Sequence, residues 1–215
     1  MGGLAARLRS EEGRDERTDQ SRDPDWQTCY AEWSENLGHI VQREDVQGQN
    51  HLASVTRIKE GWFRRITLRL VLWVINLAAR VVANRGSLGG IASIHFARWV
   101  IAPDREHLIF LSNFDGSWES YLNDFIDLAA GGLTAVWTNT DNDIGFPRTS
   151  WLVREGARDE PRFKAYARYS QVRTRAWYSA YPDLSIANIG NNMQIREQLF
   201  TDLDPTATRE WLRRL

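Results

Sequence analysis

The stretch from residue 93 to residue 128, SIHFARWVIAPDREHLIFLSNFDGSWESYLNDFIDL, constrains the fold of this 215-residue chain more than any other. Two runs in this region, residues 92–102 and 107–114, are rich in β-branched and aromatic residues and predict two strands. The turn Pro103-Asp104-Arg105 between them favours a reversal of the chain. We therefore expect the two strands to belong to one antiparallel sheet.

An amphipathic helix is predicted directly after the second strand. Ser117 is a suitable N-cap, and Glu119 places a negative charge in the first turn, where it interacts favourably with the helix dipole. Gly131-Gly132 is predicted to end the helix, and the short apolar run 133–137 (LTAVW) is typical of a buried strand. The apolar residues at helical spacing, which define the buried face, are Trp118, Tyr121, Leu122, Phe125, Leu128 and Ala129.

Two further elements are predicted upstream. Residues 51–59 (HLASVTRIK) alternate loosely between apolar and polar and predict a strand, and residues 62–84 predict a helix. The complete order is strand, helix, strand, strand, helix, strand. This is the ferredoxin-like βαββαβ plan, an α+β fold in which two helices cover one face of an antiparallel sheet. We expect it to span residues 51–138 as one domain.

The helix predicted over residues 62–84 raises the question of membrane contact. Its apolar run between Arg69 and Arg80 is shorter than the roughly 18 uncharged residues that a membrane-spanning helix needs. At about 100° per residue, Arg65, Arg69, Asn76 and Arg80 lie within a sector of about 60°. Two interpretations stay open. The helix packs on the sheet with its arginines in water, or it lies at a membrane surface with its arginines reaching anionic headgroups.

The two ends of the chain are predicted to be extensions of this domain. Residues 1–25 are densely charged with little to bury, which predicts a disordered tail. Residues 26–50 predict a short helical lead-in. Residues 139–215 predict a polar loop followed by a helical extension. Within it we expect one helix over 161–181, with a basic face, and a last helix that begins at Asp204-Pro205.

Composition narrows the class of protein. A formal net charge of -1 gives no overall basic bias, so nucleic acid is not an expected partner. Cys29 is the only cysteine, which excludes an internal disulfide framework and favours a reducing, cytoplasmic compartment. The acidic loop Asp141-Asn142-Asp143 lacks the downstream glutamate of an EF-hand, and no metal site is predicted.

The candidate catalytic residues are His95, Arg98 and Asp115, with Asn113 and Trp118 as candidate substrate-binding residues beside them. A carboxylate at Asp115 can transfer protons, and an arginine can stabilise developing negative charge. Strand alternation places His95 and Arg98 on opposite faces of the sheet unless a bulge intervenes. An alternative stays open for each residue. Asp-Gly-Ser before a helix is ordinary turn and cap chemistry, and His95 and Arg98 also suit a sheet edge or a dimer interface.

The segments IHFARWVI and LIFLSNFDGSWESYLNDFID resemble bacterial proteins of dimeric α/β-barrel type and, more distantly, the dye-decolourising peroxidases, over about residues 51–138. Those peroxidases carry a Gly-x-x-Asp-Gly signature whose Asp cleaves peroxide, a distal Arg, and a His that ligates haem. Residues 112–116 (SNFDG) keep the Asp-Gly with Ser in place of the first Gly, and no His follows His107. The resemblance implies a barrel formed by two copies, haem as a cofactor with His95 as its candidate ligand, and Asp115 as the acid-base.

Two functions are compatible with the sequence. The first is an oxidoreductase related to the haem-dependent peroxidases, with Asp115 as acid-base. The second is a non-catalytic protein, either small-molecule-binding or structural, of dimeric α/β-barrel type, held at a membrane surface by Arg65, Arg69 and Arg80. The open apolar face of a βαββαβ sheet needs a partner, so a homodimer is expected in both cases.

Overall fold

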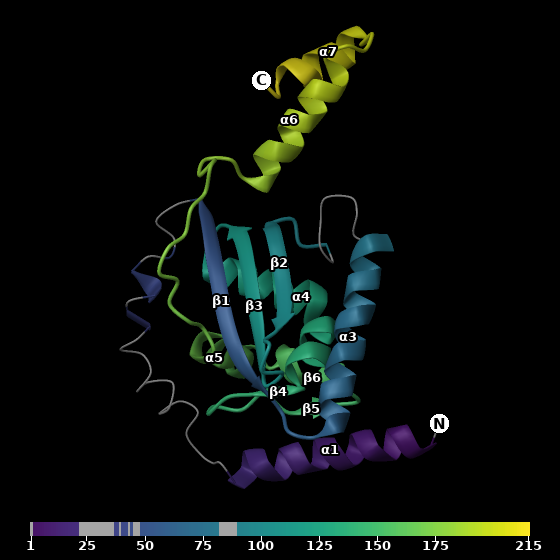
Figure 1. Ribbon diagram of the computed structural model, residues 1–215. Helices are drawn as coiled ribbons and strands as arrows, with labels where there is room; N and C mark the ends of the chain where they lie inside the picture. Colours follow the sequence, from purple (N-terminus) through teal and green to yellow (C-terminus); the bar gives the residue numbers. More distant parts are fainter. Residues whose placement is uncertain (1, 22–36, 39, 43, 45–47, 82–89) are drawn as a thin grey trace.

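The computed structural model describes residues 2–21, 37–38, 40–42, 44, 48–81 and 90–215. The strands of its main sheet are β1 (Gln49–Ile58), β2 (Ile94–Ile101), β3 (His107–Asp115) and β4 (Thr140–Asp141). They form one antiparallel sheet in the order β2-β3-β1-β4, with helices on one face, so the chain has an α+β fold (Figure 1). The strands predicted over 51–59, 92–102 and 107–114 are confirmed as β1, β2 and β3.

Helices lie behind this sheet, beside it and at its two ends (Figure 1). They are α1 (Gly2–Ser21), α3 (Trp62–Val81), α4 (Trp118–Trp137), α5 (Glu160–Tyr169), α6 (Ile186–Gln198) and α7 (Pro205–Leu212). In Figure 1, α4 and α5 lie behind the sheet, α3 stands at its flank and α1 crosses its base, while α6 and α7 project from the opposite end. A small hairpin, β5 (Thr149–Ser150) and β6 (Arg154–Glu155), leads into a short 3-10 helix, η1 (Gly156–Arg158).

The core lies between the inner face of the sheet and α4. In β3 every second side chain from Leu108 to Phe114 is buried, as the two-residue period of a strand requires. Ser117 caps α4 as predicted, since its hydroxyl accepts a backbone N–H of the first turn. Tyr121 on α4 stacks on Phe114 with ring centroids 3.9 Å apart, and its hydroxyl donates to Ser112 Oγ at 2.6 Å. Packing and hydrogen bonding thus fix α4 against β3.

The far end of α4 corrects the sequence prediction. The helix does not end at Gly131-Gly132 but continues to Trp137, so the strand expected over 133–137 is helical and buried. Neither glycine adopts the positive φ of a helix-ending glycine, and the helix kinks at Ala129 instead (φ -131°, ψ 16°). The strand that follows is β4, which holds only two residues and pairs with the end of β1.

The helix predicted over 161–181 is also shorter than expected. α5 has Pro161 in its first turn, as predicted, but ends at Tyr169. The Ser170 hydroxyl then donates back to a carbonyl of the last turn, which competes with continuation of the helix. Residues 170–184, called the strap below, run without helix from α5 towards α6 (Figure 1).

Backbone hydrogen bonds attach the start of the strap to β1. The Val55 N–H donates to the Ser170 carbonyl at 2.9 Å, and the Val172 N–H donates to the Ala53 carbonyl at 2.8 Å. β4 pairs only with the last two residues of β1, so it leaves the backbone donors and acceptors around Ala53 and Val55 without a strand partner. The strap forms hydrogen bonds with these groups in place of a longer fourth strand.

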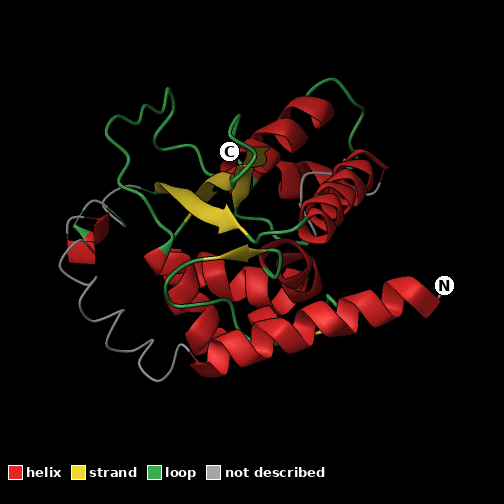
Figure 2. Cartoon of the chain, turned by 60° about the horizontal axis from the view of Figure 1, so that its bottom comes forward, coloured by secondary structure: helices red, strands yellow, loops and turns green. Residues whose placement is uncertain are grey.

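The N-terminal segment differs from the disorder expected over residues 1–25, because residues 2–21 form α1. Figure 2 shows this helix crossing the base of the molecule. Asp15 pairs with Lys59 at 2.9 Å and with Arg64, whose side chain is only 1% exposed. Burial lowers the pKa of Lys59, and the neighbouring Asp15 carboxylate opposes that shift. Contacts with buried cations of the folded body therefore hold a helix whose own composition predicts disorder.

The predicted helix over 62–84 is present as α3, which ends at Val81, and residues 82–84 lie outside the described part. None of the helices in the described ranges is long and apolar enough to cross a membrane. Most of the lead-in expected over 26–50, including its aromatic residues Trp26, Tyr30 and Trp33, also lies outside the described residues. The last helix begins at Pro205 with Asp204 as its N-cap, as predicted. α6 was not predicted.

Candidate functional site

A β-bulge in β2 brings two of the candidate residues together. Ile94 pairs with Phe114 of β3 but Phe96 pairs with Asn113, so His95 is an extra residue in this strand. The bulge turns the His95 side chain towards the end of β3. Its Nε2 lies 2.7 Å from Asp115 Oδ1.

Both oxygens of the Asp115 carboxylate have partners. Oδ1 contacts His95, and Oδ2 accepts the backbone N–H of Ile186 at 2.7 Å. Ile186 is the first residue of α6, and the N-cap Ser185 precedes it. A carboxylate at this position satisfies a free donor of the helix N-terminus and interacts favourably with the helix dipole. Asp115 therefore joins the end of β3 to the start of α6.

The other three candidates do not converge on this pair. Arg98 is exposed and lies opposite Leu111, and its side chain forms no hydrogen bond or ion pair with any described residue. Asn113 lies opposite His51 of β1. Trp118 is only 2% exposed, and the Arg168 guanidinium covers its ring at 3.5 Å from the centroid. A substrate at the His95–Asp115 pair would not touch Trp118.

The His95–Asp115 pair does not fit the haem centre that the resemblance implies. In a haem peroxidase the axial histidine binds one face of the porphyrin, and the residue that moves the peroxide protons lies on the other face. His95 and Asp115 touch each other directly, so no macrocycle can lie between them. The Asp115 carboxylate cannot orient His95 as the axial ligand and also transfer protons on the opposite face of the porphyrin.

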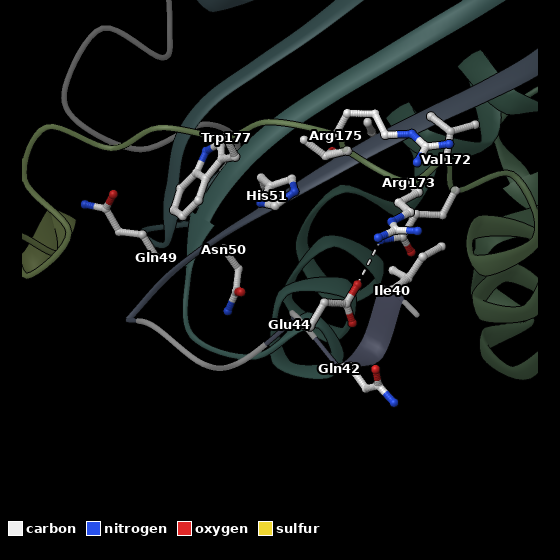
Figure 3. A pocket seen from close by; sticks show the side chains of 13 residues that line it. Ile40, Gln42, Glu44, Gln49, Asn50, His51, Val172, Arg173, Arg175 and Trp177 are labelled. Carbon is white, nitrogen blue, oxygen red and sulfur yellow. Dashed lines mark hydrogen bonds between the residues drawn. The ribbon is translucent and has the colours of Figure 1, made fainter. Parts of the chain in front are cut away.

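A hollow on the outer side of β1 is the better-formed site (Figure 3). It has a volume of about 360 Å³ and lies between β1 and the strap, and we call it the strap hollow. Its polar and aromatic lining includes Glu44, Gln49, His51, Arg173, Arg175 and Trp177.

Side chains of β1 hold the strap in place over the hollow. The Gln49 amide donates to the Tyr181 carbonyl at 3.0 Å and to the Leu184 carbonyl, and its oxygen accepts from the Ser179 hydroxyl at 2.7 Å. Further along, the His51 ring stacks on Trp177 with centroids 5.0 Å apart and an angle of 24° between the ring planes. The strap is therefore held by specific contacts with Gln49 and His51.

The strap hollow carries a net positive charge. Among the described residues its only carboxylate is Glu44, which is already bound by Arg168 at 2.7 Å and by the Gln171 amide at 2.8 Å. Arg173 and Arg175 have no ion pair or hydrogen-bond partner among the described residues. Two free guanidinium groups over a concave surface are suited to binding an anion.

Partial burial lowers the pKa of His51, and the charge of Glu44 acts in the opposite direction. With its pKa below 6.5, the imidazole is mostly neutral at pH 7. A neutral imidazole donates one hydrogen bond and accepts another, and it gains a proton when an anion binds beside it.

No local motif in the sequence singles out the residues of this hollow. His51 belongs to the strand predicted over 51–59, and Arg173 and Arg175 fall within the helix predicted over 161–181. One signal was present, because the segment 172–175 (VRTR) alternates with the period of an extended chain rather than a helix.

Comparisons with known proteins do not assign the chain to a family. No protein-family model matches it, and neither a search of the curated proteins nor a search of the solved structures gives a match.

Proposed function

We propose that the protein is a non-catalytic binding module and that the strap hollow takes a small organic anion, a carboxylate or phosphate ester with a flat apolar body. The observation that carries this proposal is the pair of arginines, Arg173 and Arg175, which face the hollow without a carboxylate partner among the described residues. Cations that face a concave site in this way lower the free energy of a bound anion.

The size and the lining of the hollow support this ligand class. A volume of about 360 Å³ falls within the roughly 300–1,000 Å³ typical of small-molecule sites. The planar guanidinium forks of Arg173 and Arg175 match carboxylate and phosphate oxygens. Trp177 and Val172 provide apolar surface for the body of the ligand.

We also propose that the module is a homodimer of ferredoxin-like, α/β-barrel type in the cytoplasm. The strand order β2-β3-β1-β4 with helices on one face supports this plan, although β4 is short. The outer face of the sheet exposes Phe96 (69%) and Val100 (44%), which a second sheet would cover. The lone Cys29 supports a reducing compartment. An Asp115-dependent peroxidase has less support, because both carboxylate oxygens are engaged.

Calorimetric titration with phenyl phosphate, and with phenol as its neutral counterpart, tests the anion site. We expect phenyl phosphate to bind and phenol not to bind. Arg173→Gln/Arg175→Gln removes two charge-assisted hydrogen bonds and is expected to weaken binding at least about tenfold. Arg209→Gln/Arg213→Gln changes two exposed arginines of the α7 region and is the matched control. Equal binding of phenol, or equal losses in the two variants, would contradict the proposal.

The pH dependence of the same titration gives a second readout. In the free protein the pKa of His51 lies below its ordinary value of 6.5, and a bound anion raises it. Binding therefore takes up a proton, and affinity increases as the pH falls from the pKa of the imidazole in the complex towards its lower pKa in the free protein. His51→Gln should remove this dependence. Without ligand, the free energy of unfolding depends on pH in the opposite direction. It decreases as the pH falls below 6.5, because His51 binds a proton more readily in the unfolded chain than in the folded protein.

A further inference from the structure

The outer side of α3 presents a continuous row of large apolar side chains. They lie at helical spacing along the whole helix, and each is between 47% and 67% exposed. We call this row the α3 stripe, and it consists of Trp62, Ile66, Leu70, Trp73, Val74, Leu77 and Val81.

The α3 stripe lies opposite the side of the helix that packs on the protein. Leu68 is fully buried, and Val71, Leu72 and Ile75 pack against the core. At about 100° per residue these positions are roughly half a turn away from Trp73 and the rest of the stripe. Figure 1 shows no described helix or strand over this outer side, and α1 reaches only its base. There, Arg7 approaches the Trp62 ring at 6.0 Å from the centroid.

A second, independent feature lies beside the stripe. Four arginines from α3, β1 and the β2–β3 turn converge on a hollow of about 630 Å³, which we call the arginine hollow. The side chains of these four arginines form no hydrogen bond or ion pair with another described residue. Two carboxylates also line it, which leaves an excess of two positive charges. The charged lining is Arg57, Arg65, Arg69, Arg105, Glu60 and Glu106.

We propose that α3 docks on the surface of a bilayer that contains anionic phospholipids. The α3 stripe would enter the interfacial region, where the amphipathic rings of Trp62 and Trp73 are stable, and the arginine hollow would hold headgroup phosphates. Arg80, which is exposed on the same side of the helix as Arg69, extends the cationic flank towards the other end.

Charge complementarity selects this occupant over an uncharged apolar partner. A purely apolar partner would cover the stripe but leave Arg65 and Arg69 facing low-dielectric surface without a counter-ion, which is costly. An anionic bilayer satisfies both features at once, because it offers an apolar interior next to a layer of phosphates. This inference does not depend on the proposed function of the strap hollow, because the strap runs beside β1, at the opposite edge of the sheet from α3 (Figure 1).

Co-sedimentation of the full chain with vesicles tests the proposal. One set of vesicles is pure phosphatidylcholine, and the other has about one third of it replaced by phosphatidylglycerol. We expect binding to the anionic set only, with an affinity that falls as salt is added. Arg65→Gln/Arg69→Gln should weaken binding about 30-fold, because each arginine near the surface contributes about fivefold. Trp73→Ser/Leu77→Ser should weaken it by at least about tenfold.

Matched control variants lie at the opposite end of the molecule. Arg209→Gln/Arg213→Gln removes two exposed arginines, and Leu199→Ser/Phe200→Ser removes two exposed apolar side chains after α6. Both should bind the anionic vesicles like the unchanged protein. Phenyl phosphate titration of every variant reports on the strap hollow separately, so that one proposal can fail without the other.

Three outcomes would overturn the proposal. The protein binds neither set of vesicles, or it binds both sets equally, or the control variants lose as much binding as the α3 variants. Light scattering after gel filtration identifies the main competing occupant. If Trp73→Ser/Leu77→Ser converts a dimer to a monomer while the unchanged protein ignores anionic vesicles, the α3 stripe is a contact between two copies of this chain.

Discussion

The two longest helices beside the sheet have the same length but different surroundings. α3 and α4 each contain 20 residues, begin with tryptophan and carry many large apolar side chains. α4 buries 11 residues, whereas α3 buries only Phe63, Arg64 and Leu68. Apolar content therefore does not determine burial within one chain. When neighbouring elements leave part of a helix's apolar surface exposed, that surface is a candidate for binding another molecule.

The difference arises from what lies around each helix. The sheet covers one side of α4, and the segment from η1 into α5 covers another, where Ala157 is fully buried. The Ala157 N–H donates to Thr134 Oγ1 of α4 at 3.0 Å. α3 contacts α4 along its inner side and α1 at its base, where Arg64 pairs with Asp15. Half of its circumference has no cover from the described residues.

The largest expected effect separates the two helices by their free energy of unfolding. Phe125→Ala on α4 removes a ring that packs edge-on against Phe110 and Tyr121, and it should destabilise the protein by about 3–5 kcal/mol. Trp73→Ala on α3 removes a larger ring but should change stability by less than about 0.5 kcal/mol. Urea unfolding followed by circular dichroism measures both values.

Leu68→Ala is the control within α3 itself. Leu68 is fully buried and Leu70, two residues on, is 58% exposed. Leu68→Ala should lower the free energy of unfolding by about 2–5 kcal/mol, whereas Leu70→Ala should leave it almost unchanged. If Trp73→Ala or Leu70→Ala costs as much as Leu68→Ala, the α3 stripe is covered in the folded protein and the contrast with α4 is wrong.

A smaller effect is expected from the charges that cover the start of α4. Arg168 stacks over Trp118 and is bound by Glu44, and both charged side chains are less than 10% exposed. Glu44→Gln leaves the Arg168 guanidinium without its counter-ion and should cost about 1–3 kcal/mol. Glu119→Gln removes an exposed carboxylate that pairs with Lys164 at 2.8 Å, and it should cost less than about 1 kcal/mol.

The pair Glu44 and Glu119 makes this comparison informative, because both carboxylates bind cations of α5 near the same end of α4. Thermal unfolding of the two variants at equal ionic strength gives the ranking. Equal losses would mean that the Glu44–Arg168 pair is as accessible to water as the surface pair.

Much of the framework is predictable from the sequence, because local signals determine it. Period-two alternation identifies β1 and β3, and the Ser117 cap identifies the start of α4. The His95 bulge was foreseen only as a condition, since a bulge depends on which partner residues a strand meets. α1 was missed because its charges are favourable only next to Lys59 and Arg64 of the folded body.

The candidate site was the least predictable part. The sequence indicates Asp115 as a candidate acid-base. Its contact with the N-terminus of α6 depends on a helix that the sequence did not predict. The strap hollow depends on where residues 170–184 run, and this path is set by contacts such as Gln49 with Tyr181 and His51 with Trp177. These contacts connect positions more than 100 residues apart in the sequence. No local pattern in the sequence specifies such distant pairings. The resemblance to the peroxidases instead indicated His95 and Asp115, in a neighbouring region of the same sheet.

The last comparison concerns the glycines in and beside α4. Gly132 is exposed within the helix, and a Cβ there would meet no atom within 4 Å, so Gly132→Ala should stabilise the protein by about 0.5–1 kcal/mol. Gly156 has a φ of +54°, and a Cβ there would collide with the Thr134 side chain of α4. Gly156→Ala should therefore destabilise it by more than about 1 kcal/mol. Urea midpoints measure both. A loss of stability in Gly132→Ala would instead favour the helix end predicted from the sequence, where alanine is strained.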